Sequence, residues 1–115
     1  LSFVPLVAPT TSDARIAKIA GVADAFLYCV SVTGVTGQRS AMPAELPAFI
    51  ERVREHAKLP VAVGFGISTR EHVEAVGRIA DGAVIGSAII ATIDAAEPQL
   101  RAQRVREFVE DVTGR

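Results

Sequence analysis

The sequence has one cysteine, almost no net charge and no long apolar run, and each of these shortages excludes a class of protein. Cys29 stands alone, so an internal disulfide is excluded and a reducing cytoplasm is the expected location. The net charge is −1 at pH 7 without a large cluster of lysine or arginine, which argues against nucleic-acid binding. The apolar runs are short and broken by glycine or aspartate, so neither a membrane span nor a signal peptide is expected.

Histidine is scarce as well, and the spacing of metal ligands is missing. His56 and His72 have no partner at such a spacing, so no metal is expected. His56 closes a helical stretch, His72 lies in a first helical turn, and both are predicted to have surface roles. Cys29 alternates away from Tyr28 and is predicted to lie in the core as a small hydrophobic residue.

What the 115 residues do contain is a repeated alternation of short apolar runs and amphipathic stretches. Half of the residues are hydrophobic and 22% are charged, which is ordinary for a globular protein, and the length allows one domain at most. The apolar runs predict strands at residues 2–8, 25–30, 60–65 and 82–86, each followed by a helix.

Start signals support the first three helices. The sequence Thr-Thr-Ser-Asp at residues 10–13 is typical of a helix start, and Pro43 suits the first turn of the second helix. Ser68 and Glu71 have the spacing of a capping box for the third helix. The predicted apolar face of the second helix consists of Leu46, Phe49, Ile50, Val53 and Ala57.

Strands joined through helices of this length run parallel, and their near-continuous apolar character predicts that both faces of the sheet are covered. Right-handed crossovers then gather the carboxyl ends of all the strands at one edge. An open doubly wound sheet and half of a TIM (β/α)8 barrel both accept four such units. The last unit favours the half-barrel, because a short apolar helix at residues 88–93 and a break at Pro98 precede the last helix. The predicted apolar face of that last helix consists of Leu100, Val105, Phe108, Val109 and Val112.

Glycine-rich turns follow the third and fourth predicted strands. Gly66 and Gly86 lack a Cβ, so the backbone there can approach an anion. Ser87 opens the short extra helix, whose free N–H groups and dipole favour negative charge. Two adjacent turns of this kind, together with the extra helix, predict a phosphate site. Ordinary turn geometry is the alternative explanation for each glycine by itself.

The loop at residues 33–42 is longer than the roughly two to six residues usual between a strand and a helix. Its Gly34 and Gly37 suit the hinges of a lid that closes over the site and excludes water. An ordinary surface loop is the alternative.

Four segments of the sequence resemble the tryptophan synthase alpha chain family, in the C-terminal half of its barrel. They are "LVAPTTSDARI", "YCVSVTGVTG", "LPVAVGFGIS" and "ADGAVIGSAII", and they look like barrel strands 5 to 8 with their following turns. The similarity covers essentially all 115 residues, and "GVTG" and "GFGIS" are its most specific pieces. It implies that residues 1–115 form a single partial domain. Because the chain begins at Leu1, inside a predicted strand, we expect a fragment of a longer protein.

The resemblance implies an activity and a partner. The family consists of lyases of tryptophan biosynthesis that cleave indole-3-glycerol phosphate to indole and glyceraldehyde 3-phosphate. This retro-aldol reaction uses no cofactor and no metal. The implied partner is the tryptophan synthase beta chain, in an alpha2beta2 tetramer.

The resemblance also assigns roles to individual residues. Backbone N–H groups for the phosphate would come from Gly37, Gly66, Gly86 and Ser87. Tyr28 and Phe65 would line the indole pocket, whereas the residues alone predict core aromatics there. Thr36, in the lid, would support the catalytic aspartate through a hydrogen bond. Val32 departs from family members with a basic residue at that position, so a salt link made there is not expected.

The sequence offers no acid and base of its own for this cleavage, which needs two carboxyl groups at the substrate. Asp24 and Asp81 precede strands, at the edge opposite to the glycine turns, and are predicted to be turn residues. The other acidic residues fall on helices. The catalytic pair is therefore expected in the missing N-terminal half. Two alternatives stay open, namely another phosphosugar-binding TIM-barrel isomerase or epimerase, and a non-catalytic half-barrel module.

Overall fold

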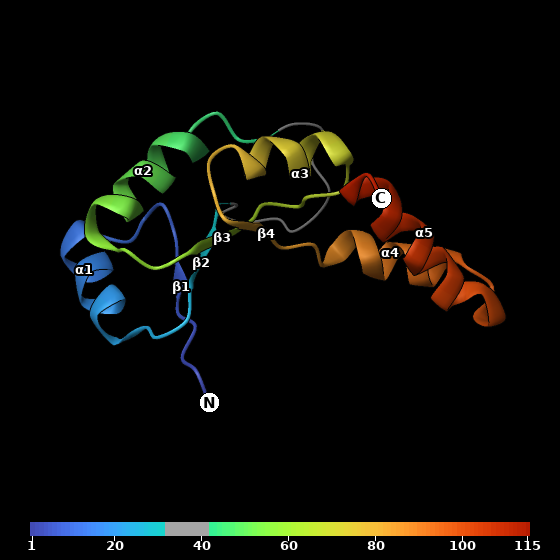
Figure 1. Ribbon diagram of the computed structural model, residues 1–115, viewed down its shortest axis with the longest axis horizontal. Coiled ribbons are helices and arrows are strands. Elements are labelled where there is room, and N and C mark those ends of the chain that lie inside the picture. Colours follow the sequence, from blue (N-terminus) through green and yellow to red (C-terminus); the bar gives the residue numbers. More distant parts are fainter. Residues whose placement is uncertain (32–41) are drawn as a thin grey trace.

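The computed structural model describes residues 1–31 and 42–115, which alternate between strands and helices in the predicted order (Figure 1). The strands are β1 (Leu6–Val7), β2 (Leu27–Val30), β3 (Val61–Gly64) and β4 (Gly82–Ala83). The helices are α1 (Asp13–Val22), α2 (Leu46–His56), α3 (Arg70–Gly77), α4 (Ser87–Ala95) and α5 (Arg101–Thr113), with a short 3-10 turn η1 (Pro98–Leu100) before α5.

The strands form one parallel sheet in the order β1-β2-β3-β4. The central pair is in register from Leu27 opposite Val61 to Val30 opposite Gly64. The predicted parallel α/β arrangement is confirmed. The edge strands β1 and β4 are shorter than predicted, because each has a hydrogen-bonding partner on one side only.

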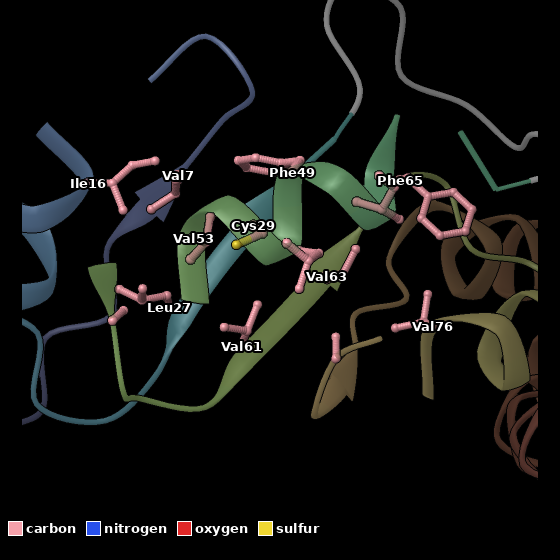
Figure 2. Packing of buried hydrophobic residues seen from close by; sticks show 14 of the residues in the cluster. Val7, Ile16, Leu27, Cys29, Phe49, Val53, Val61, Val63, Phe65 and Val76 are labelled. Carbon is pink, nitrogen blue, oxygen red and sulfur yellow. The ribbon is translucent and has the colours of Figure 1, made fainter. Parts of the chain in front are cut away.

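The core lies between the sheet and the helices α1, α2 and α3 (Figure 1). Figure 2 shows Val7, Cys29 and Val63 from three strands meeting Phe49 and Val53 of α2. The predicted core position of Cys29 and the predicted apolar face of α2 are confirmed, since these residues are among the buried cluster. This one layer of packing accounts for most of the buried apolar side chains.

The opposite face of the sheet has no such cover among the described residues. Leu6 on β1 is 65% exposed, and Tyr28, Val30 and Ala62 are only half-buried, whereas their neighbours on the helical side are buried. The prediction that both faces are covered is therefore wrong for this part of the chain. A continuous apolar strand shows that its second face avoids water in some context, but not that the same segment supplies the cover.

The C-terminal helices extend beyond β4 (Figure 1). The Cα radius of gyration is 15.3 Å, against about 13 Å for a compact domain of about this length. Of the predicted apolar face of α5, Val112 is buried, Leu100, Val105 and Phe108 are half-buried and Val109 is 42% exposed, so this face is only partly covered. The helix contacts α3 and α4 rather than the sheet.

The starts of α1 and α4 agree with the sequence, whereas that of α2 differs. The Ser12 hydroxyl accepts a hydrogen bond from the Arg15 N–H at 3.3 Å and caps α1, as its position predicts. Ser87 begins α4, as predicted. The second helix begins at Leu46 rather than near Pro43, because the Pro43 carbonyl first closes a turn by accepting from the Leu46 N–H at 3.1 Å.

Aspartates tie the amino ends of the strands together. The Asp24 carboxylate, before β2, accepts from the Phe3 N–H at 2.7 Å. The Asp81 carboxylate, before β4, accepts from the Val61 N–H at 2.9 Å and from the Arg54 guanidinium at 3.1 Å. These bonds hold the pKa of Asp81 below its usual 3.8, with the backbone bond from Val61 as the main cause. The predicted turn role of both residues is confirmed.

Candidate functional site

The segments after the strands gather at the carboxyl edge of the sheet. Gly66 follows β3 and Gly86 follows β4, and these strands are hydrogen-bonded neighbours. Ser31 follows β2 directly, and its N–H donates to the Gly64 carbonyl at 3.1 Å, which extends the pairing toward this edge. The predicted glycine turns therefore lie side by side at the ends of adjacent strands.

Gly66 has a backbone conformation that only glycine adopts readily. Its φ is +87°, in the left-handed region, where a Cβ would be strained. The next residue, Ile67, is 1% exposed and anchors the turn in the core. The turn thus directs its backbone to the edge while its neighbouring side chain points inward.

The turn after β4 differs in its reason for glycine. Gly86 has φ −126° and ψ −74°, outside the left-handed region, and an added Cβ would meet no atom within 4 Å. Gly86 and Ser87 are exposed, and no side chain caps the first turn of α4. Among the described residues, the first bond that closes this turn runs from the Ile90 N–H to the Gly86 carbonyl at 3.1 Å. The preceding N–H groups of the helix have no side-chain cap, and free N–H groups at a helix start suit an anion.

The two predicted pocket aromatics lie in different surroundings. Tyr28 is half-buried, and its hydroxyl lies 2.8 Å from the point where a Cβ on Gly64 would stand. Because Tyr28 pairs with Ala62, its ring reaches two residues toward the carboxyl edge. Phe65 is 1% exposed and belongs to the core cluster, where its ring meets that of His72 edge to face at 5.4 Å between centroids. The structure brings Tyr28, but not the Phe65 ring, to the uncovered face of the sheet.

The start of α3 corrects two predictions. The N-cap is Thr69 rather than Ser68, and its hydroxyl accepts from the His72 N–H at 3.2 Å. The Glu71 carboxylate accepts from its own backbone N–H and from the Thr69 hydroxyl. These bonds, the backbone one first, lower the pKa of the carboxyl below the usual 4.5. His72 is 3% exposed, so its predicted surface role is wrong, and its Nδ1 accepts from the Ser68 N–H at 3.1 Å. In a capping box, the side chain three residues into the helix bonds the backbone N–H of the N-cap residue, which is Thr69 here. The His72 imidazole instead bonds the N–H of Ser68, one residue earlier.

The second histidine is half-buried between two helices. The Nε2 atom of His56 lies 3.9 Å from an Asp13 carboxylate oxygen. Asp13 also pairs with Arg52 at 2.7 Å, and this bond is the main cause that lowers the pKa of Asp13 below its usual 3.8. The predicted surface role of His56 therefore holds only in part.

Arg52 is a residue that sequence reasoning missed. Its guanidinium donates to the Pro9 and Thr11 carbonyls, each at 2.8 Å, and so holds the loop that follows β1. Its side chain also stacks at 5.8 Å over the Phe49 ring. No local signal could have identified this role, because these carbonyls lie 43 and 41 positions away along the chain.

Several predicted site features fall outside the described residues. These are Thr36, Gly37, Val32, the hinge Gly34 and nearly all of the lid at residues 33–42. Within the described ranges, no acidic residue stands in the turns after β3 or β4. In the connection after β2, Glu45 lies at the far end as the N-cap residue of α2, and the acidic residue nearest to the end of β1 is the ion-paired Asp13. The described residues also contain no group of three or more potential metal ligands. None of their helices is both long and apolar enough to cross a membrane.

Known proteins match nearly the whole length of this chain. A family model described as tryptophan synthase alpha chain matches residues 1–114. The chain is 51% identical to the tryptophan synthase alpha chain of Roseiflexus castenholzii over 114 residues, which is 99% of this chain and 44% of the relative. It is 45% identical to the tryptophan synthase of Saccharomyces cerevisiae over 97% of this chain and 16% of that protein. The chain thus spans less than half the length of these relatives.

Solved structures give the same result. A mutant tryptophan synthase alpha subunit of Pyrococcus furiosus matches with a TM-score of 0.85 at 32% identity, over 99% of this chain and 45% of that one. A chain of the tryptophan synthase complex from the same organism matches with a TM-score of 0.85 at 30% identity, over 100% of this chain and 45% of that one. The four parallel βα units therefore correspond to under half of a TIM barrel. Sequence and fold together place the chain in the tryptophan synthase alpha chain family.

Proposed function

We propose that this chain is the phosphate-binding half of a tryptophan synthase alpha chain, which cleaves indole-3-glycerol phosphate to indole and glyceraldehyde 3-phosphate. The observation that carries the proposal is the pair of turns at the carboxyl ends of β3 and β4. One turn contains Gly66 at φ +87°, and the other leads from Gly86 into the uncapped first turn of α4.

These turns suit a phosphate because they offer backbone donors without competing side chains. The substrate phosphate takes N–H groups from Gly66, Gly86 and Ser87, and the positive end of the α4 dipole favours its charge. The absence of any atom within 4 Å of a Gly86 Cβ leaves room for the phosphate oxygens. Gly37 would add a further N–H from the loop.

The indole ring occupies the uncovered face of the sheet in this proposal. Tyr28 has the clearer structural support, because its half-buried ring reaches along this face toward the carboxyl edge. Phe65 follows β3 directly and precedes Gly66, but its ring lies in the core, so in this proposal it borders the pocket through its backbone. Thr36 closes over the substrate as part of the lid and orients the catalytic aspartate.

The proton transfers come from residues outside this chain. Retro-aldol cleavage needs one carboxyl group to protonate the indole ring and another to take the hydroxyl proton. In this proposal the chain is the C-terminal half of a longer barrel, and the other half supplies both groups. No cofactor or metal takes part.

We also propose that the complete protein binds a tryptophan synthase beta chain in an alpha2beta2 assembly. The support is the similarity to a chain of the Pyrococcus furiosus tryptophan synthase complex. Co-purification of a tagged complete protein with its own beta chain tests this assembly, and recovery of the alpha chain alone at micromolar concentration would count against it.

The phosphate site is tested in a hybrid protein. It consists of the part of the Roseiflexus castenholzii relative that lies outside the matched region, fused to residues 1–115 of this chain, so that a whole barrel is present. The readouts are indole release from indole-3-glycerol phosphate and calorimetric titration with glycerol phosphate. Gly86→Asp places a carboxylate against the phosphate and should abolish detectable binding. Ser87→Ala, its matched control, keeps the backbone donor and should weaken binding less than about threefold.

Three outcomes separate the candidate functions. Indole release by the hybrid, lost with Gly86→Asp and kept with Ser87→Ala, supports the proposal. Phosphate binding without indole release favours a different phosphosugar enzyme. Equal, mild effects of the two substitutions contradict the anion site. Residues 1–115 alone should release no indole, because they contain no carboxyl pair at the carboxyl edge.

A further inference from the structure

The buried imidazole of His72 has no role in the function proposed above. It is 3% exposed on the first turn of α3 and packs against the Phe65 ring. Its Nδ1 accepts from the Ser68 N–H at 3.1 Å, while its buried Nε2 has no hydrogen-bond partner among the described residues. One nitrogen of the ring is therefore hydrogen-bonded, and the other is buried without a hydrogen bond.

The bond from Ser68 determines which nitrogen of the neutral ring carries the proton. A neutral imidazole has one donor nitrogen and one acceptor nitrogen. Because Nδ1 accepts from a backbone N–H, the proton of the neutral ring lies on Nε2. A proton on Nδ1 would place two N–H groups against each other, so the bond from Ser68 selects the tautomer with the proton on Nε2.

The contacts of His72 also immobilise the turn that contains Gly66. The turn is anchored by Ile67, which is buried, and by Ser68, whose N–H is held by the ring. The ring is in turn held by the edge contact with Phe65 and by the bond from the His72 N–H to Thr69. The bond to Nδ1 withdraws the Ser68 N–H from any ligand, whereas no hydrogen bond among the described residues occupies the N–H of Gly66 or of Ile67.

We propose that His72 is a positioning residue that orients the Gly66 N–H toward the substrate phosphate by binding the Ser68 N–H through Nδ1. The inference rests on the proposed phosphate site. Without the acceptor at Nδ1, the Ser68 N–H is unpaired and the turn rotates away from its binding conformation. Binding of the phosphate weakens, whereas the chemical step, which takes place elsewhere on the substrate, is unaffected.

Three substitutions in the hybrid separate this role from simple core packing. Asparagine places its side-chain oxygen where Nδ1 lies, so His72→Asn keeps the acceptor. Glutamine is polar and one methylene longer than asparagine, so His72→Gln places its amide near the position of Nε2 and leaves Nδ1 unreplaced. His72→Leu removes both polar atoms. Thermal unfolding is measured for each variant, and if the leucine variant does not fold, the asparagine and glutamine pair still decides.

The expected result is a split between KM and kcat. KM for indole-3-glycerol phosphate should rise about fivefold to tenfold in H72Q and H72L, which corresponds to the loss of one hydrogen bond, with kcat changed less than about twofold. H72N should stay within about twofold of the parent. Glycerol phosphate affinity should follow the same order. NMR of the ring nitrogens in the parent should show the proton on Nε2.

Each contrary result overturns a defined part. Unchanged KM in all three variants, or an equal rise in H72N and H72L, removes the positioning role and leaves the phosphate site intact. A proton on Nδ1 in the parent removes the inference irrespective of any binding result. If the parent hybrid does not bind glycerol phosphate at all, the proposed function fails and this inference fails with it.

Discussion

The two ends of the strands are finished by different chemistry. At the amino ends, aspartates bind backbone N–H groups, from Asp24 to Phe3 and from Asp81 to Val61. At the carboxyl ends of β3 and β4, the turns contain glycine, and the first N–H groups of α4 have no side-chain cap. One edge satisfies its backbone groups internally, and the other leaves donors for a ligand.

This difference indicates where the chain is built for stability and where it is built for binding. In TIM barrels the active site lies at the carboxyl ends of the strands, while the amino ends contribute to stability. The carboxyl end of β1 is intermediate, because Arg52 occupies the carbonyls of its loop. Within residues 1–31 and 42–115, the open donors therefore lie on the β3 and β4 side of the edge.

The largest effect is expected from Gly66→Ala in the hybrid. A Cβ at φ +87° destabilises the turn by about 1–2 kcal/mol and forces the backbone away from its binding conformation. Glycerol phosphate affinity should fall more than tenfold by calorimetry, and urea unfolding should show the lower stability. Unchanged affinity would separate this turn from the anion site and remove half of the comparison.

Arg52→Met tests whether the carboxyl end of β1 is structural. The substitution leaves the Pro9 and Thr11 carbonyls without their donor and should lower the free energy of unfolding by about 2 kcal/mol. Phosphate affinity should change less than twofold. Arg106→Met, on the exposed surface of α5, is the matched control and should stay within about 0.5 kcal/mol. A larger effect on phosphate affinity than on stability would show that this loop belongs to the site.

Asp81→Ala tests the amino ends, with a defined dependence on pH. At pH 7 the loss of the bonds to Val61 and Arg54 should lower stability by about 1 kcal/mol, a modest value because the side chain is 51% exposed. The pKa of Asp81 is lowered in the folded state, so its stabilisation is present above the usual value of 3.8 and is lost as the pH falls through the folded-state pKa.

The melting temperatures of parent and variant should therefore converge in strongly acidic solution. Asp94→Ala is the control, because Asp94 is exposed on α4. A difference between parent and D81A that persists unchanged at pH 2 would mean that the carboxylate charge is not what stabilises this edge.

The smallest effect is expected from Gly86→Ala. Its φ of −126° lies outside the left-handed region, and no atom lies within 4 Å of the added Cβ. Unfolding should change by less than about 0.5 kcal/mol. A change above about 1 kcal/mol would show that Gly86 is required by the fold, and would remove the distinction between a glycine needed for conformation and one needed for space.

The order of elements could be predicted because its signals are local. Alternating apolar runs predict β1 to β4 and the helices between them, and Ser12 and Ser87 mark helix starts within a few residues. The apolar face of α2 follows from its spacing alone. The glycine turns after β3 and β4 were also identifiable, since a single residue type carries the backbone freedom that Gly66 requires.

What could not be predicted depends on contacts between distant residues. The Arg54 bond to Asp81 joins positions 27 apart, and the Arg52 bonds span still longer separations. The burial of His72 depends on the Phe65 ring, and the cap at Thr69 differs from the expected one by a single residue. The open face of the sheet was missed because an apolar residue such as Leu6 does not reveal what covers it.

Labelling of Cys29 with a thiol reagent reports how often the sheet opens. Cys29 lies under α2 in the cluster of Figure 2, and burial raises the pKa of its thiol to about 11. At pH 8 only about one thiol in a thousand would be the reactive thiolate, and the folded sheet shields even that fraction from reagents. Because the sequence has no other cysteine, the labelling rate of the protein measures a single event, the separation of β2 from the layer above it. Comparing that rate with and without glycerol phosphate would test whether a bound phosphate slows the opening of the sheet.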